Sequence, residues 1–313
     1  MSPKYEDIQE LIRRRADLNA RLKLLPYDGT PEVKTRGDKK YLYVRKRELG
    51  KQKSSYVGVY SDELYNILLS NAREAREIRK ELRALDKELA SLGYEEASLS
   101  SNVLMNIDFA RANMKTNIYD QAVLEGVGTT FPQTEEIIDN GKVSGVKASD
   151  VQKILNLKHA WEFILDKDVI TCKSDYYLLS QIANLVNEGF YIDGGRMRSL
   201  PVEIGGSSYL PPIPMEADVK DDINSIISED APAIDTAIKL CLYTMKKQIF
   251  LDGNKRSAII FANHYLIAHA GGFLVIPENE VEEFKKLLVD YYEGEDVKII
   301  SAFMKEKSWK RLE

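Results

Sequence analysis

The sequence contains few of the residues that cross-link chains or bind structural metals. It holds two cysteines, Cys172 and Cys241, and three histidines among 313 residues. Two thiols cannot build a disulfide framework, and they are too few for a structural zinc site made of cysteines. We therefore interpret both as ordinary core or surface residues, and we expect an apolar core to hold the fold together.

Long apolar runs and a strong positive charge are missing too. No stretch of about 18 apolar residues occurs, which argues against a membrane-spanning helix. The N-terminus lacks the pattern of a secretory signal peptide, so we expect a soluble, cytoplasmic protein with no membrane partner. The formal net charge of −5 argues against nucleic-acid binding by the protein as a whole.

The chain is long enough to bury a large core. Hydrophobic residues make up 44% and charged residues 30% of the composition. This length suggests one large or two modest domains. A polar, serine-rich joint at residues 94–101 predicts a boundary, with a first domain at residues 1–95 and a second at residues 100–313.

The first domain is predicted to be a helical hairpin. Leucine, isoleucine and alanine recur three and four residues apart within residues 8–25 and again within residues 75–92. This is the spacing of two helices that pack antiparallel. Ser2 is the predicted N-cap of the first helix, and Ser61 opens the second.

The segment between these helices is strongly basic. Residues 33–57 hold nine Lys or Arg against two acids, and the runs 40–44 and 55–60 favour a β-hairpin with its turn near Gly50. Basic residues interleaved with tyrosines could hold nucleic acid at residues 34–53 through phosphate contacts and stacking. The alternative is an edge hairpin that its lysines protect from aggregation.

The strongest chemical signal is a polar loop, residues 248–257, between two apolar helical segments. A helix that begins there leaves N–H groups unpaired and favours anions. Lys255 and Arg256 add charge to its first turn, where cations destabilise a helix unless an anion is bound. Asp252 offers a hard oxygen ligand for Mg²⁺, and Gly253 lets the backbone approach a phosphate closely.

Two interpretations of this loop remain open from the residues alone. The first is a cradle for phosphate and metal. The second is an N-cap, Asp252 or Asn254, before a core helix with a solvated Lys-Arg pair beside it. The loop does not match the Gly-x-x-x-x-Gly-Lys-[Ser/Thr] pattern of a P-loop.

The loop resembles the signature of the Fic/Doc (Fido) family, His-x-Phe-x-[Asp/Glu]-[Gly/Ala]-Asn-[Gly/Lys]-Arg. The matching residues are Phe250, Asp252, Gly253, Asn254, Lys255 and Arg256. Gln248 stands where the family has its catalytic His. Lys255 stands where many members have Gly, and in this it resembles the Doc-like branch, whose members phosphorylate their targets rather than adenylylate them. The resemblance implies a mainly α fold, a Fido-type helical bundle with a β-hairpin flap.

Two further segments resemble the family. Residues 195–214 resemble the flap, whose free edge docks an extended segment of a target protein by adding a strand. The flap residues singled out are Val202, Ile204, Gly205, Gly206 and Tyr209. The alternative for this segment is an ordinary surface hairpin.

The other segment is Glu125-Gly126, which resembles the motif of self-inhibited family members. Gln121 replaces the motif's Ser or Thr, and Ile259 stands where the inhibitory Glu would find its Arg partner. The resemblance leaves Arg256 as the cation within reach of Glu125. The alternative is a helix end with Gly126 as its C-cap.

Helices are also predicted from periodicity elsewhere in the second domain. They cover residues 107–124, 151–165, 176–187, 258–270, 280–292 and 296–305, with a short strand at 273–277. His264 is predicted to lie roughly 15 Å along its helix axis from Asn254, too far to act as a base at the loop. His159 is predicted to be a partly buried structural residue.

The resemblance implies a transferase that moves AMP or phosphate from ATP, with Mg²⁺, to a hydroxyl of a target protein. It implies catalytic positions at Gln248, Asp252, Asn254 and Arg256, nucleotide contacts from Gly253, Asn254, Lys255 and Arg256, and Mg²⁺ ligation by Asp252. Gln248 cannot accept the hydroxyl proton, and a general base contributes about 10²- to 10⁴-fold. We therefore expect weakened or altered transfer, or alternatively a catalytically silent nucleotide-binding regulatory or scaffold module.

Overall fold

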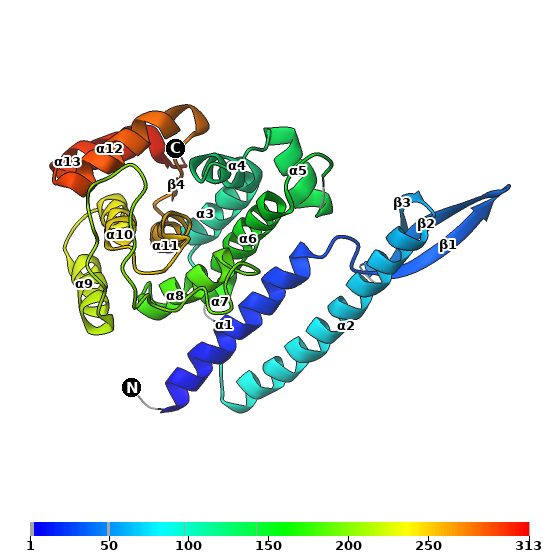
Figure 1. The fold of residues 1–313 in the computed structure, drawn as a ribbon. Helices are drawn as coiled ribbons and strands as arrows, with labels where there is room; N and C mark the ends of the chain where they lie inside the picture. Colours follow the sequence, from blue (N-terminus) through cyan, green and yellow to red (C-terminus); the bar gives the residue numbers. More distant parts are fainter. Residues whose placement is uncertain (1–2, 49–50, 97, 142, 313) are drawn as a thin grey trace. The chain divides into compact units, whose positions relative to one another are not determined.

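The computed structural model describes residues 3–48, 51–96, 98–141 and 143–312 (Figure 1). The chain divides into two compact units, Met1–Glu96 and Ala97–Glu313. The predicted N-cap Ser2 and the predicted turn at Gly50 lie outside the described residues. Within the described part of the chain, no helix combines the length and the apolar character needed to cross a bilayer.

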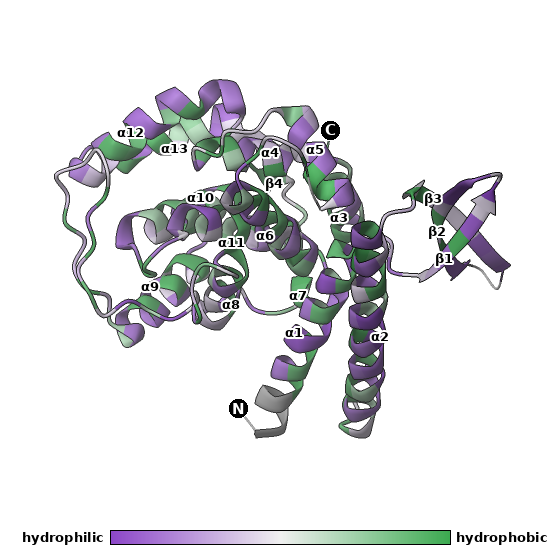
Figure 2. Cartoon of the chain, turned by 45° about the vertical axis from the view of Figure 1, so that its right-hand side comes forward, coloured by the Kyte–Doolittle hydropathy of each residue, from purple (hydrophilic) through white to green (hydrophobic). Residues whose placement is uncertain are grey.

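Two long helices, α1 (Pro3–Leu24) and α2 (Asp62–Ser91), form the body of the first unit. The Ser61 hydroxyl accepts a hydrogen bond from the Leu64 N–H, which confirms Ser61 as the opening of α2. Leu18 of α1 is buried with Ile78 and Leu85 of α2. Figure 2 shows the resulting alternation of hydrophobic and hydrophilic residues along both helices.

The sheet of the first unit has three strands, where two were predicted. They are antiparallel in the order β1 (Thr30–Arg36), β2 (Lys39–Glu48) and β3 (Lys51–Val59). β1 was missed because it is an edge strand with a proline, Pro31, and has no run of alternating apolar residues. The central strand β2 contributes Leu42 and Val44 to a core shared with α2.

The second unit is mainly helical, which confirms the predicted fold class. Its helices are α3 (Ser101–Ala112), α4 (Met114–Leu124), α5 (Phe131–Asn140), α6 (Ala148–Ile164), α7 (Lys167–Ile170), α8 (Tyr176–Val186), α9 (Glu216–Ser228), α10 (Ala233–Lys247), α11 (Asn254–Ala268), α12 (Val281–Glu293) and α13 (Val297–Phe303). A short 3₁₀ helix, η1 (Glu278–Glu280), and a π-helical turn, η2 (Met304–Ser308), follow. A small sheet, β4 (Phe273–Leu274) with β5 (Trp309–Lys310), completes the unit.

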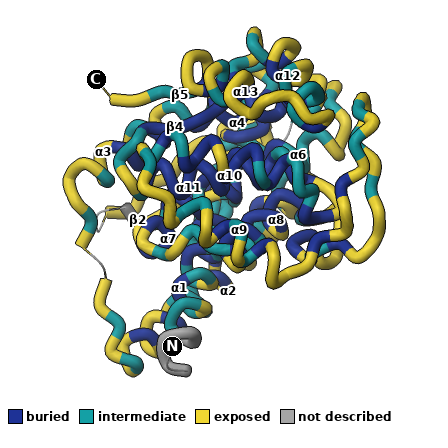
Figure 3. Tube along the Cα trace, turned by 90° about the vertical axis from the view of Figure 1, so that its left-hand side faces the viewer, coloured by how far each residue is buried: buried dark blue, intermediate teal, exposed yellow. Residues whose placement is uncertain are grey.

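Helix α11 is the core element of this unit. Thirteen of its residues are buried, and it packs against α10, α8 and α6. The buried segments in Figure 3 are concentrated on these four helices. A helix that is apolar on all sides must be surrounded by other elements. Its polar N-terminal residues therefore lie at the loop that connects α10 to α11.

The predicted helix over residues 107–124 is divided into α3 and α4 at Asn113. The Asn113 side chain donates to the Phe109 carbonyl, 2.9 Å away, and so competes with the backbone hydrogen bonds of a continuous helix. Helices α5 and α9 occupy segments that carried no prediction. For α5 the signal was present, because Thr130 and Gln133 form a capping box.

The predicted β-hairpin within residues 195–214 is not formed as such. Among these residues, which the structure describes in full, the regular pairing consists of one bridge, between Met197 and Phe250. The segment continues as extended chain with a turn in which the Ser207 N–H donates to the Ile204 carbonyl. Its four prolines cannot donate to a ladder, which explains the missing strands. From here on, the name flap refers to residues 199–214, the part of this segment that follows the bridge.

Candidate functional site

The loop between α10 and α11 is shaped by its own polar side chains. Gln248 ends α10 in a left-handed conformation, with a φ of 48°. Asn254 then accepts a hydrogen bond from the Phe250 N–H and donates to the Phe250 carbonyl and to the Gln248 side-chain oxygen, at 2.9, 2.8 and 3.1 Å. Asn254 therefore closes the loop and begins α11, as predicted.

The first turn of α11 has no side-chain cap. Its N-cap is Gly253, with a φ of 74° and no side chain that could accept a hydrogen bond. The N–H groups of this turn have no partner within the helix and carry partial positive charge. Neither Asp252 nor Asn254 is the N-cap, so the structure removes the simplest alternative to an anion site.

A cavity of about 460 Å³ opens in front of this turn. This volume lies within the usual range for small-molecule sites, roughly 300–1,000 Å³. It is lined by loop residues, by the flap, by α12 and by the end of α4. The lining includes Asp252, Gly253, Asn254, Lys255, Gln248, Glu125, Val202, Ile204, Gly205 and Lys285.

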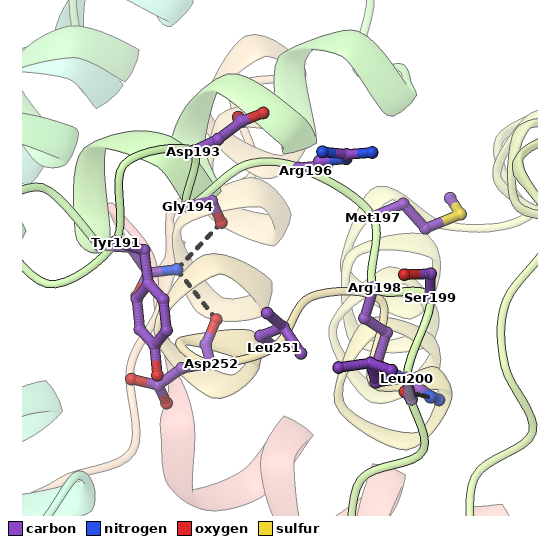
Figure 4. A pocket seen from close by; sticks show the side chains of 11 residues that line it. Tyr191, Asp193, Gly194, Arg196, Met197, Arg198, Ser199, Leu200, Leu251 and Asp252 are labelled. Atoms are coloured by element: carbon purple, nitrogen blue, oxygen red, sulfur yellow. Dashed lines mark hydrogen bonds between the residues drawn. The ribbon is translucent and has the colours of Figure 1, made fainter.

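Asn187 is a residue of this region that the sequence did not single out. Its side chain donates to the carbonyls of Gly194 and Asp252 at 3.1 and 2.9 Å, drawn as dashed lines in Figure 4. A Cβ on Gly253 would lie 2.7 Å from the Asn187 side-chain oxygen. Gly253 is thus required both by its positive φ and by this contact. Burial of an asparagine at the end of α8 was the signal, but it is visible only in three dimensions.

Arg256 lies behind the cavity wall and is only 2% exposed. Its guanidinium donates to the Val186 carbonyl at 2.7 Å and to Asp252 at 3.0 Å. The Glu125 carboxylate is 3.4 Å from the Arg256 Nε atom and 3.8 Å from the Lys255 Nζ atom. Glu125 therefore lies between the two cations of the first turn.

The contact between Glu125 and Arg256 is an ion pair without a hydrogen bond. The Glu125 Oε1 and Arg256 Nε atoms are both buried and have no hydrogen-bond partner. Gln121, one turn earlier on α4, donates to the Arg256 carbonyl at 2.9 Å and so holds α4 against α11. Glu125 is the C-cap of α4, and Gly126 after it has a φ of 73°, the left-handed conformation usual for a glycine just past a helix end.

The Gln248 side chain is held in place at both ends. Its Nε2 atom donates to the Met245 carbonyl at 2.6 Å, and its Oε1 atom accepts from Asn254 at 3.1 Å. It has no group that titrates near neutral pH. The histidines do not replace it: His264 is buried between Ser174 and the Val169 carbonyl, and His159 is fully buried rather than partly.

Arg198 ties the flap to the loop. The guanidinium of this buried residue donates to the carbonyls of Gln248 and Leu200 and to those of Pro211 and Pro212. The two ends of the flap are therefore held at one point, directly beside the end of α10. The Arg198 N–H also donates to the Ile249 carbonyl, at 3.0 Å.

The structure brings part of the predicted flap set to the cavity. Val202, Ile204 and Gly205 line it, whereas Gly206 lies in the exposed turn with a φ of 83°. Tyr209 stacks instead on Tyr292 of α12, with ring centroids 6.4 Å apart.

A second, smaller cavity of about 200 Å³ is also lined by the loop (Figure 4). Leu251 and Asp252 line both cavities. The remaining walls come from residues 191–200 and Asn187.

Metal binding rests on Asp252 in the predicted scheme. Its side chain is 49% exposed, and one oxygen pairs with Arg256. Within the described part of the chain no group of three or more His, Cys, Asp or Glu could hold a metal ion. One accessible carboxylate beside a cavity agrees with the usual coordination of Mg²⁺, which binds through one or two carboxylates together with substrate phosphates.

Comparison with known proteins gives two kinds of result. A family model for a domain of unknown function, DUF6788, matches residues 5–66. No curated protein matches the sequence.

Several solved structures of Fic-domain proteins are similar to this chain. Fic-1 from C. elegans is 20% identical, with a TM-score of 0.53 over 78% of this chain and 73% of its own. A Fic family protein from Desulfovibrio desulfuricans is 16% identical, with a TM-score of 0.52 over 67% and 73%. A Fic domain containing signaling protein from Bacteroides thetaiotaomicron is 19% identical, with a TM-score of 0.50 over 61% and 75%. These likenesses confirm the fold that the loop resemblance implied: the chain has a Fic-type fold.

Proposed function

We propose that the cavity in front of α11 is the nucleotide site of a Fic-type transferase, which moves AMP or phosphate from ATP to a hydroxyl of a target protein. The supporting observation is the uncapped start of α11, with Gly253 at its N-cap, facing a cavity of about 460 Å³. Unpaired N–H groups at such a position bind phosphate oxygens. Lys255 and Lys285 add positive charge to the same lining.

Glu125 occupies the anion position within this site. It is the carboxylate that lies within 4 Å of both Lys255 and Arg256. We infer that a phosphate group competes with Glu125 for these cations, so that Glu125 lowers nucleotide affinity. The unmade hydrogen bonds of the pair make its displacement less costly than that of a well-bonded ion pair.

Mg²⁺ would be held by Asp252 together with phosphate oxygens. It would supply charge neutralisation at the phosphates. The second oxygen of Asp252 pairs with Arg256, which orients the carboxylate toward the loop. In this scheme Arg256 contributes by orienting Asp252, as long as Glu125 lies against the Arg256 Nε atom.

The reaction joins the target's hydroxyl oxygen to a phosphorus atom of ATP and breaks that atom's bond to the bridging oxygen of the leaving group. The leaving group is pyrophosphate when AMP is moved and ADP when phosphate is moved. The hydroxyl proton must then pass to water or to a phosphate oxygen, because Gln248 cannot take it. Positioning and charge stabilisation remain, and these are the main terms in phosphoryl transfer. The proposed activity is therefore weak, by about the 10²- to 10⁴-fold that a general base contributes.

The target would dock at the flap. The extended chain of the flap has few internal backbone hydrogen bonds, and the flap residues Leu200, Leu210 and Ile213 are exposed. An extended peptide can pair with such a segment, main chain to main chain, while apolar pockets or side chains select its residues. Arg198 keeps this docking segment beside the loop.

A second candidate is a silent nucleotide-binding module. It is favoured by the way both ends of the Gln248 side chain are engaged by Met245 and Asn254, which leaves little reason to assign it a chemical role. Such a module would bind ATP and regulate a partner according to whether ATP is bound, without transferring any group.

The test uses ATP labelled at the α- or the γ-phosphate, the full-length chain with Mg²⁺, and the variant Gln248→His. Label on the wild-type chain or on an added protein supports the transferase, and the labelled phosphate identifies the group moved. If only Gln248→His incorporates label, the silent module is favoured. If neither incorporates label and ATP causes no thermal shift, the site does not bind nucleotide and both proposals fail.

A further inference from the structure

The sheet of the first unit has two unlike faces. Leu42 and Val44 of β2 point to one face, where they are buried against Leu68 of α2. Successive strand residues alternate between faces. Tyr41, Tyr43 and the residues level with them therefore lie on the opposite face, which we call the tyrosine face.

Three tyrosines form a cluster on this face. The Tyr56 ring centroid lies 5.5 Å from that of Tyr43 and 6.3 Å from that of Tyr41. Tyr56 is 55% exposed. The Lys34 Nζ atom lies 4.4 Å from the Tyr43 ring centroid. Tyr41 and Tyr43 are half-buried. The cluster therefore presents one exposed ring and two partly accessible rings to solvent, with a cation beside them.

The charge on the tyrosine face is strongly one-sided. The strand register and alternation place Lys34, Arg36, Lys39, Arg45 and Arg47 there. Among the described strand residues, Glu32 is the one acid that the register adds, and it lies 3.5 Å from Lys34. On the covered face, Lys46 forms an ion pair with Asp28 at 2.9 Å.

Protection of sheet edges does not account for every cation in this pattern. Lysines on β1 and β3 would serve that purpose, since these are the edge strands. Arg45, however, lies on the central strand and pairs with Thr30 on one side and Ser54 on the other. A cation there, beside clustered tyrosines, guards no open edge.

The geometry points to a binding site for single-stranded nucleic acid on the tyrosine face. Bases would stack on Tyr43 and Tyr56, and Arg36 and Arg45 would contact the phosphates. Exposed aromatic rings on a sheet, flanked by cations, are the arrangement that holds unpaired bases and tracks their backbone. A duplex is a poorer fit, because its bases are already stacked on one another and offer the rings no free surface. The net acidity of the whole chain does not oppose this, because the charge is local.

The experiment measures fluorescence anisotropy of a labelled oligouridine and the matching oligothymidine with the full-length chain. We expect saturable binding that weakens steadily as salt is raised, because cations on the protein replace counterions of the phosphates. Tyr56→Ala should weaken binding by about tenfold or more. Arg45→Gln should weaken it and reduce its salt dependence.

Two matched controls decide whether the face is responsible. Tyr177, at 54% exposure, is an equally exposed tyrosine in the second unit, and Lys46 is a cation on the covered face. Tyr177→Ala and Lys46→Gln should leave binding unchanged. Absence of binding at low salt would overturn the proposal, as would equal losses in the control variants. Binding of the duplex or of heparin as tightly as the single strand, with Tyr56→Ala without effect, would also overturn it. A preference between the RNA and the DNA oligomer would identify the natural class.

Discussion

Glu125 is a charged side chain enclosed at the start of α11, near two cations and without a hydrogen bond at its Oε1 atom. The reasoning from sequence held that two cations at a helix N-terminus require an anion. The structure supplies one from the protein itself. The charges of Lys255 and Arg256 are thus partly neutralised by Glu125, and an anionic ligand must compete with this carboxylate for them.

Replacing Glu125 by Gln should therefore strengthen ATP binding. The substitution keeps the shape of the side chain and removes the charge that pairs with Lys255 and Arg256. We expect the dissociation constant for ATP with Mg²⁺, measured by isothermal titration calorimetry, to fall by about tenfold, the equivalent of ~1.4 kcal/mol.

Glu203→Gln is the matched control for general electrostatics. Glu203 lines the same cavity but is exposed. It should improve affinity by much less, because solvent screens it. If both variants tighten binding equally, Glu125 has no special part in the site and the competition model is wrong.

At the scale of elements, the flap and the α10–α11 loop depend on one residue. Arg198 donates to carbonyls on both. Arg198→Ala should lower the free energy of unfolding by about 2 kcal/mol or more, since buried carbonyls lose charged donors. Chemical denaturation measures this loss, and limited proteolysis should show faster cleavage within residues 199–214.

Arg196→Ala provides the comparison, because Arg196 is an exposed arginine two residues away. It should change stability by no more than about 0.5 kcal/mol. Arg198→Lys should fall between the two, since an ammonium group cannot span the same set of carbonyls. Identical stability and proteolysis in the Arg196 and Arg198 alanine variants would contradict this role.

For the molecule as a whole, acid should weaken the second unit through His264. Burial lowers the pKa of this histidine from 6.5 to about 4. The folded state therefore favours the neutral ring. As pH falls below 6.5 the unfolded chain takes up a proton first, so stability is lost progressively until the pH reaches about 4, by up to about 3 kcal/mol.

His264→Gln should flatten this dependence, since the side chain no longer titrates. The measurement is the free energy of unfolding by denaturant at several pH values between neutral and about pH 5, above the range in which most carboxylates titrate. The variant will be less stable at neutral pH, because the contacts with Ser174 and Val169 are altered. An unchanged slope would show that His264 does not govern the acid response.

The sequence predicted the elements whose local pattern is strong. The start of α11 at Asn254, the opening of α2 at Ser61 and the helical fold class follow from periodicity, capping chemistry and the loop resemblance. Edge strand β1 and the division at Asn113 were missed, because tertiary pairing or a side-chain hydrogen bond decided them. Of the site, the loop was foreseen, but the burial of Arg256 and the contacts of Asn187 and Arg198 join segments far apart in the chain. Such contacts leave no local pattern.

Leu251 and Asp252 of the loop line both the larger and the smaller cavity. A small compound bound in the smaller cavity would therefore contact two residues that also line the larger one. A screen for compounds that bind beside residues 191–200 would thus also yield ligands that contact the loop.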